Sequence, residues 1–387
     1  MRTTLVPERT GAVLPAAAPK ISRRPRLVAL DGLRLVAALL VVFHHYVGYG
    51  GGPDAAHNAW GRTTAQVFPT ASRFGTYTWT GVELFFLISG FVICMSSWGR
   101  GLGAFFVSRV VRLYPAYWFA VLATTAVLTL WPVLHHPAHV RDVLLNLTML
   151  HEPLGVGSVD AVYWTLWVEM RFYLLFALVV WKGLTYRRVV AFCLLWSVAS
   201  VFAGRLPFAD YVVMPEFSSY FVAGIAMYLM YRHGPTPLLW GIVLLSWLFS
   251  VNQVARYSLG LSDQLGHPMR EMPAIALMTL GYLAMIALAL GKLSWLRGRW
   301  LTIAGALTYP LYLMHEEIGW TAIRLLHGRI APWPLVGLLT AGMLLAAWLV
   351  HRLVERPLSR ALKHRLTDAL AATRERAAGV PVPDGPR

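Results

Sequence analysis

The first apolar run of the chain, residues 30–45, reads LDGLRLVAALLVVFHH. It carries Asp31 and Arg34 near one end and His44 and His45 at the other, with only apolar residues between them. The surrounding window, residues 28–49, is long enough to cross a membrane as a helix. Ionisable side chains are costly in hydrocarbon, and where they occur they usually serve a transport pathway or a reaction. The sequence therefore predicts a membrane helix with one functional face.

Helical geometry decides which of these side chains share that face. Arg34 and His45 are eleven residues apart, about three turns and roughly 16 Å along the axis, so they lie in register. A neutral imidazole is the usual general base near pH 7, which makes His45 the candidate catalytic base. His44 projects from another face and is expected to be a packing or hydrogen-bonding neighbour that lines the substrate site. Asp31 is placed to pair with Arg34; the alternative is an ion pair that only anchors the helix end.

Composition sets the class of protein. The chain has 387 residues, of which 57% are hydrophobic and 13% charged, and it contains 16 Trp. A soluble domain carries about 25% charged residues, so the deficit predicts a polytopic membrane protein. The net charge of +16 is concentrated between apolar runs, which favours loop charge over nucleic-acid binding. Cys94 and Cys193 lie in separate apolar runs, so neither a structural disulfide nor a metal site is expected from them.

Apolar windows predict an all-α bundle of about ten transmembrane helices. Lys and Arg are more frequent in the segments on the side of the termini, which places both termini in the cytoplasm. Residues 1–26 are predicted to be a disordered cytoplasmic tail, residues 27–358 a single transmembrane domain, and residues 359–387 a second cytoplasmic tail. The predicted spans are 28–49, 77–98, 110–133, 161–181, 188–204, 211–231, 236–252, 272–291, 300–320 and 331–351.

Two further segments carry charge into or beside these spans. Glu83 is an acid in an otherwise apolar helix, and Ser89-Gly90 in the same helix allows close helix packing. Arg109 and Arg112 share a helix face at i, i+3 and form a fork suited to phosphate oxygens. Anchoring to anionic lipid headgroups explains the same two arginines equally well.

The fourth and ninth spans add the last candidates. Glu169 and Arg171 do not face one another at i, i+2, so each needs a separate partner. Glu169 is a candidate to orient or polarise an imidazole, with a buried structural hydrogen bond as the alternative. His315 is followed by two acids, a pattern that is more often structural. Its position beside Tyr309 and Tyr312 keeps a substrate-lining role open for His315 and Tyr312.

No Walker loop, dinucleotide-binding glycine pattern, Gly-x-Ser-x-Gly elbow or His-Glu-x-x-His motif is present, so ATP, NAD and zinc chemistry have little support. Taken together, the charged segments resemble the acyltransferase-3 family of membrane acyltransferases. The resemblance covers roughly residues 30–358 and rests on six blocks in order: Asp31-Gly32-Leu33-Arg34 with His45, Gly81 to Phe91, Arg109/Arg112 before Leu113-Tyr114-Pro115, Trp164 to Tyr173, Leu311 to His315, and Glu355-Arg356-Pro357-Leu358.

The resemblance implies a ten-helix bundle that transfers an acyl group from acyl-CoA, as co-substrate and without a metal, to a hydroxyl of a sugar or related acceptor. It implies that His45 is the catalytic histidine, Arg34 its essential companion, and Arg109 and Arg112 the residues facing the CoA phosphates. Glu83 stands where the family usually has Asp, a difference expected to change the shape of the substrate pocket.

Within the family the chain is most similar to macrolide O-acyltransferases of antibiotic-producing actinomycetes, which predicts a multi-pass protein of the bacterial plasma membrane. An O-acetyltransferase of envelope polysaccharide or peptidoglycan keeps the chemistry and changes the acceptor. A secondary transporter is an alternative from another class, because buried His, Arg and Glu also form proton relays. Transporters commonly contain inverted repeats, and the sequence has no evident repeat.

Overall fold

The computed structural model describes residues 27–205, 208–265 and 269–377, and every regular element in these ranges is helical. Nine helices of the described chain are long and apolar enough to cross a membrane, which confirms the predicted all-α polytopic class. The main elements are α1 (Val28–Phe43), η1 (His44–Tyr49), α2 (Thr64–Val67), α3 (Ala71–Gly75), α4 (Gly81–Ser97), α5 (Leu102–Leu130), α6 (Val140–Asn146), η4 (Ala161–Tyr163), α7 (Trp164–Trp181), α8 (Tyr186–Phe202), α9 (Ala209–Val213), α10 (Pro215–His233), α11 (Pro237–Leu265), α12 (Glu271–Ala289), α13 (Arg299–Met314), α14 (Glu317–Leu326), α15 (Pro332–Val350), η6 (His351–Glu355) and α16 (Arg356–Ala377).

The predicted span over residues 300–320 is broken in the structure. Helix α13 has only 16 residues and ends at Met314, and α14 begins separately at Glu317. A residue distant in sequence stabilises the break, because the backbone N–H of Glu317 donates to the carboxylate of Asp160 at 3.3 Å instead of continuing the helix. The bend leaves His315 and Glu316 at a buried corner between the two helices.

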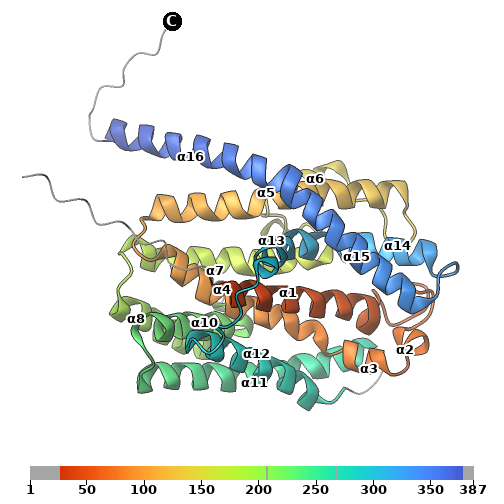
Figure 1. Ribbon diagram of the computed structural model, residues 1–387, viewed down its shortest axis with the longest axis horizontal. Coiled ribbons are helices and arrows are strands. Elements are labelled where there is room, and N and C mark those ends of the chain that lie inside the picture. Colours follow the sequence, from red (N-terminus) through yellow and green to blue (C-terminus); the bar gives the residue numbers. More distant parts are fainter. Residues whose placement is uncertain (1–26, 206–207, 266–268, 378–387) are drawn as a thin grey trace, which may run out of the picture.

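The long helices run side by side along the molecule, with α1 near the middle of the bundle (Figure 1). Helix α1 packs against α13 and α4, and α4 packs against α10. Glycines set the α4–α10 distance: a Cβ at Gly90 would lie 2.2 Å from the carbonyl oxygen of Phe221, and one at Gly224 would lie 2.1 Å from that of Leu87. The predicted packing role of Gly90 is therefore confirmed, since small residues allow membrane helices to approach closely.

The C-terminal segment predicted as a tail forms helix α16 as far as Ala377. This helix lies along α5, where the Ser359 hydroxyl donates to the carbonyl of Val111 at 2.9 Å. The predicted disordered tail, residues 1–26, lies outside the described residues. Cys94 and Cys193 are both free and buried.

Candidate active site

Helix α1 does not continue unchanged through its two histidines. Residues His44–Tyr49 form a π-helix, η1, a wider turn that often occurs at functional sites. Within this turn the ring of His44 is buried, and its Nδ1 lies 3.1 Å from the carbonyl oxygen of Gly75. His44 is therefore a hydrogen-bonded packing residue, which agrees with the packing role predicted for it. The side chain of His45 instead points toward the corner after α13.

His45 and His315 form a hydrogen-bonded pair, with Nδ1 of His45 2.8 Å from Nε2 of His315. The other nitrogen of His315, Nδ1, lies 2.8 Å from the carbonyl oxygen of Tyr312. A carbonyl only accepts, so neutral His315 must carry its proton on Nδ1 and accept at Nε2. His45 then donates from Nδ1, and this network assigns the lone pair to Nε2 of His45. That nitrogen is the one able to take a proton from a substrate.

Three contacts hold the pair in place. The indole of Trp320 donates to the carbonyl of His45 at 2.9 Å, and the hydroxyl of Tyr46 donates to the carbonyl of His315 at 2.8 Å. Glu316 Oε1 lies 3.7 Å from His45 Nε2. Sequence reasoning noticed Glu316 only as an acid after His315. Its adjacency to a buried histidine was the available signal, but the helix break that turns it toward α1 was not foreseen.

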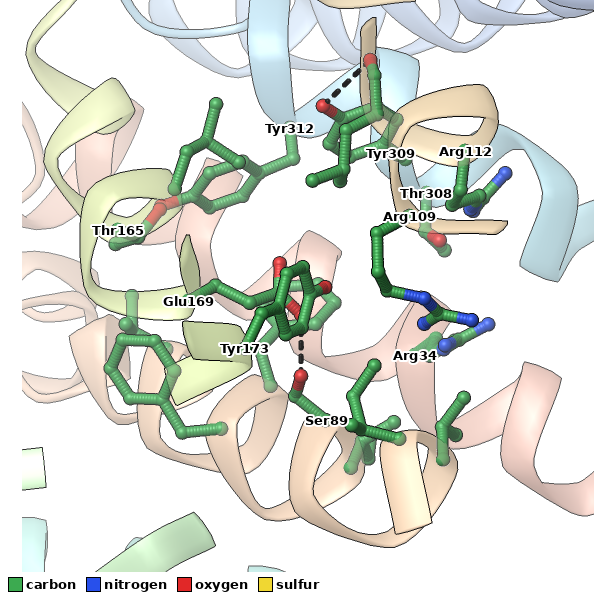
Figure 2. Close-up of a pocket in the computed structure, with 18 residues that line it drawn as sticks. Arg34, Ser89, Arg109, Arg112, Thr165, Glu169, Tyr173, Thr308, Tyr309 and Tyr312 are labelled. Atoms are coloured by element: carbon green, nitrogen blue, oxygen red, sulfur yellow. Dashed lines mark hydrogen bonds between the residues drawn. The ribbon is translucent and has the colours of Figure 1, made fainter. Parts of the chain in front are cut away.

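A cavity lies toward the N-terminal half of α1, and we call it the arginine cavity (Figure 2). It contains about 810 Å³ of space free of protein atoms, counted out to open solvent. The close-up shows the side chains of Arg34 and Arg109 both extending into the cavity, where Glu169 and Tyr173 also lie. The lining residues are Arg34, Val82, Phe85, Phe86, Ile88, Ser89, Val92, Ile93, Arg109, Arg112, Leu113, Thr165, Leu166, Glu169, Tyr173, Thr308, Tyr309 and Tyr312.

The two arginines of α5 have different surroundings. Arg109 donates to the hydroxyls of Ser96 at 3.2 Å and Ser108 at 3.1 Å. Arg112 is ion-paired with Glu355 of η6, and Glu355 also accepts from His351 at 2.7 Å. The two arginines predicted to bind phosphate together therefore differ in charge, because the carboxylate of Glu355 already neutralises Arg112. The sequence separation of 243 residues between Arg112 and Glu355 explains why this pairing was missed.

Glu169 belongs to the arginine cavity and not to the histidine pair. It accepts a hydrogen bond from the hydroxyl of Ser89 on α4, so Ser89 does more than the predicted helix packing. None of the described hydrogen bonds of Glu169 goes to an imidazole, although the sequence suggested such a partner. The acid that lies beside His45 is Glu316. Arg171 has a separate partner, as predicted, and donates to the carbonyl of Tyr211 at 2.8 Å.

Tyr312 connects the arginine cavity to the histidine pair. Its side chain lines the cavity, and its hydroxyl shares a hydrogen bond with the Thr165 hydroxyl at 2.9 Å. Its carbonyl holds His315, and the two rings are 5.7 Å apart. Tyr312 therefore contacts the arginine cavity through its side chain and the histidine pair through its carbonyl.

Asp31 and Glu83 lie outside the cavity lining. Asp31 is buried against α13, where a Cβ added to Gly305 would come within 2.5 Å of its side chain. Glu83 is buried on α4, and its Oε2 has no hydrogen-bond partner among the described residues. The structure thus brings together Arg34, Arg109, Arg112, Glu169 and Tyr312 in one cavity, and His45 with His315 beside it.

A cationic cavity and a buried pair of imidazoles, connected through Tyr312 inside a bundle of apolar helices, define a multi-pass membrane protein with an enzyme-like site. The chain belongs to the acyltransferase family whose domain matches residues 27–352, which confirms the resemblance and makes it a membrane acyltransferase.

Two relatives cover most of the chain. The exopolysaccharide production protein ExoZ of Rhizobium meliloti (strain 1021) is 29% identical over 329 residues, 79% of this chain and 98% of ExoZ. The acyltransferase MdmB of Streptomyces mycarofaciens is 27% identical over 401 residues, 89% of this chain and 95% of MdmB. No solved structure matches the chain.

Proposed function

We propose that the protein transfers an acetyl- or propionyl-type group from acyl-CoA to a hydroxyl of a macrolide, in the bacterial plasma membrane. The observation that carries the proposal is the position of Tyr312, which lines the arginine cavity with its side chain and holds His315 with its carbonyl. A donor bound among the arginines would extend past this residue toward His45.

The arginine cavity suits the acyl donor by charge. CoA carries several phosphates, and guanidinium groups match phosphate oxygens in charge and geometry. Arg34 and Arg109 line the cavity and supply cations to it, while Arg112, which also lines it, is ion-paired with Glu355. Apolar and aromatic residues of α4 and α13 make up much of the remaining lining, which fits the less polar arm and its thioester.

The histidine pair supplies the base. In the proposed reaction, Nε2 of His45 takes the proton of the acceptor hydroxyl as its oxygen attacks the thioester carbonyl. The carbon–sulfur bond then breaks, and the protonated His45 returns the proton to the departing thiolate. His315 holds the ring of His45 through Nδ1 during both transfers. A covalent acyl-histidine on His45 is the rival path, and acyl label trapped on the protein without acceptor would support it.

The macrolide acceptor rests on the resemblance of the sequence motifs to macrolide O-acyltransferases. A bacterial polysaccharide is the second candidate, favoured by the relative ExoZ, whose name refers to exopolysaccharide production. Both acceptors offer hydroxyls to the same base, so the acceptor has to be determined by experiment.

The test is acyl transfer by membranes that contain the protein. Acetyl-CoA or propionyl-CoA is supplied with a panel of macrolides and, separately, with bacterial polysaccharide, and the added acyl mass is located by mass spectrometry. We expect a macrolide to gain one acyl group, and His45→Ala to lose the activity by about 10²–10⁴-fold. His57→Ala is the matched control, because His57 is an exposed histidine paired with Asp54.

Transfer only to polysaccharide would overturn the macrolide acceptor and keep the chemistry. Movement of a substrate across the membrane without acyl-CoA consumption would instead identify a transporter. Full activity of a normally expressed His45→Ala protein would remove His45 as the base.

A further inference from the structure

A cluster of three buried acids lies behind the histidine pair, and we call it the acid cluster: Asp160, Glu316 and Glu317. Their exposed fractions are 0%, 4% and 6%. Asp160 precedes the short helix η4, and the two glutamates form the corner between α13 and α14. Three carboxylates this close cannot all be ionised in a buried site without strong repulsion, so the cluster must hold protons or counter-charges.

Glu317 has its own counter-charge. Its Oε2 lies 2.9 Å from Nδ1 of His135, a residue outside the membrane-spanning segments whose side chain is 43% exposed. This hydrogen bond raises the pKa of His135 above its usual value. The pair of Glu317 and His135 therefore accounts for one of the three acids.

The other two acids share a proton. Asp160 accepts the backbone N–H of Glu317 at 3.3 Å, which places its carboxyl group close to that of Glu316, and two buried carboxyl groups so close together favour a state in which one is protonated. Burial raises the pKa of Asp160, so the pair keeps a proton at neutral pH. Glu316 Oε2 is buried and has no hydrogen-bond partner among the described residues, so an ionised Glu316 would lack a donor to stabilise its charge.

Backbone amides decide which acid carries the charge. Asp160 accepts from the N–H of Val162 at 3.3 Å and from the N–H of Glu317 at 3.3 Å. Amide donors stabilise the ionised form of a carboxyl group. Asp160 thus has a donor at each carboxyl oxygen, whereas the buried Oε2 of Glu316 has none among the described residues, so the shared proton belongs to Glu316 and the negative charge to Asp160.

This position of the proton matters because Glu316 Oε1 faces His45 Nε2 at 3.7 Å. An ionised Glu316 at that distance would stabilise the protonated form of His45. The lone pair on Nε2 would then be unavailable to accept a proton from the substrate. We propose that Glu316 is a positioning residue kept neutral by Asp160, and that this keeps His45 in the free-base form. The inference rests on the proposed function, in which His45 is the base.

The other titratable groups around His45 do not replace this role. His44 lies beside it on η1, and His315 accepts from it at the end of α13. Tyr46 and Tyr49 lie on the same π-helix near Glu316. The tyrosines are neutral across the pH range of catalysis, so Glu316 is the neighbouring group whose ionisation would change the charge next to Nε2.

The test compares the pH dependence of kcat/KM for two variants that leave the charge in different places. Glu316→Gln puts a permanently neutral group beside His45 and leaves the charge on Asp160, so the acid limb of the profile stays in place. Asp160→Asn removes the carboxylate that holds the proton on Glu316, so Glu316 ionises beside His45. The acid limb then moves up by about one pH unit, so kcat/KM at pH values on that limb falls about tenfold and recovers at more alkaline pH.

Glu152→Gln, a change at an exposed acid, is the control for handling and expression. Unmoved profiles in both variants, or a larger shift in Glu316→Gln than in Asp160→Asn, would overturn the inference. If Asp160→Asn fails to fold, infrared spectra of the purified protein decide the matter. The difference spectrum between the wild type and Glu316→Gln should show the loss of one carbonyl band of a protonated carboxylic acid, while the bands of other buried acids such as Glu83 cancel; a difference spectrum without this loss would place the proton elsewhere.

Failure of the inference is distinguishable from failure of the proposed function. An inactive His45→Ala protein with unmoved profiles in both acid variants would leave the base in place and remove only the role of Glu316. A fully active His45→Ala protein would remove the proposed base itself.

Discussion

His45 Nδ1 and His315 Nε2 lie 2.8 Å apart although 270 residues separate them in the chain. The contact ties the π-helix at the end of α1 to the corner after α13, and the carbonyl of Tyr312 fixes its polarity. A base whose ring is held by a second imidazole is preorganised for proton transfer, because its free nitrogen keeps one direction.

Replacing His315 should therefore lower kcat more than it changes the KM for acyl-CoA. His315→Ala leaves the Nδ1–H of His45 without its acceptor, and we expect kcat to fall about 10- to 100-fold, less than the 10²–10⁴-fold of losing the base itself. His315→Gln should retain more activity than His315→Ala, because its amide oxygen can accept the same hydrogen bond. Steady-state kinetics on membranes checks both, and equal activity of the two variants would contradict a hydrogen-bonding role.

The arginine cavity predicts a different kinetic effect. Arg34→Lys or Arg109→Lys keeps the charge but loses the planar donor geometry that binds phosphate in pairs. We expect the KM for acyl-CoA to rise about tenfold or more, since a hydrogen bond to a charged group contributes about 1.5–3 kcal/mol. Arg171→Lys is the control, because Arg171 binds the carbonyl of Tyr211 outside the cavity. An equal rise of KM in the control would mean that the effect is not local.

The ion pair between Arg112 and Glu355 should contribute to stability. Glu355 is buried and the Arg112 side chain is 35% exposed, and the pair joins α5 to the segment before α16. Glu355→Gln should lower the free energy of unfolding by about 1–3 kcal/mol, measured as a lower melting temperature of the detergent-solubilised protein. An unchanged melting temperature would show that water replaces the carboxylate without cost.

Most of the helices could be predicted from the sequence because a membrane requires each span to satisfy its own backbone hydrogen bonds over about 20 apolar residues. The exception over residues 300–320 has a cause outside that segment, since the break in it depends on Asp160, which is distant in sequence. Apolar windows carry no information about such a side chain.

The candidate site was predictable in part for the same reason. Helical register selected His45 over His44, and the structure directs His45 toward His315 even though the turn is a π-helix. Glu316 was not predicted as a neighbour of His45, because only the corner after α13 brings it there. Glu355 was not predicted as a partner of Arg112, because nothing in the local sequence links α5 to η6.

The crossing of α4 and α10 predicts a sharp contrast between two glycines. A Cβ at Gly224 would lie 2.1 Å from the carbonyl oxygen of Leu87, whereas one at Gly241 on α11 would meet nothing within 4 Å. Gly224→Ala forces two helix backbones apart, and overpacking of this kind costs about 1–3 kcal/mol. Gly241→Ala should change stability by no more than about 0.5 kcal/mol. Melting temperatures of the two solubilised variants check this, and similar values would contradict the close crossing.

The pair of His135 and Glu317 makes stability depend on pH. Its hydrogen bond raises the pKa of His135 above the ordinary value of 6.5. A group whose pKa is higher in the folded state stabilises the fold fully below its unfolded pKa, and the gain is lost as pH rises through the folded value. The melting temperature of the wild type should therefore exceed that of His135→Gln most clearly below pH 6.5, and the difference should shrink at more alkaline pH. Because His135 is partly exposed, salt should weaken the effect. A difference that grows with pH would reverse the sign and show that Glu317 does not hold the protonated imidazole.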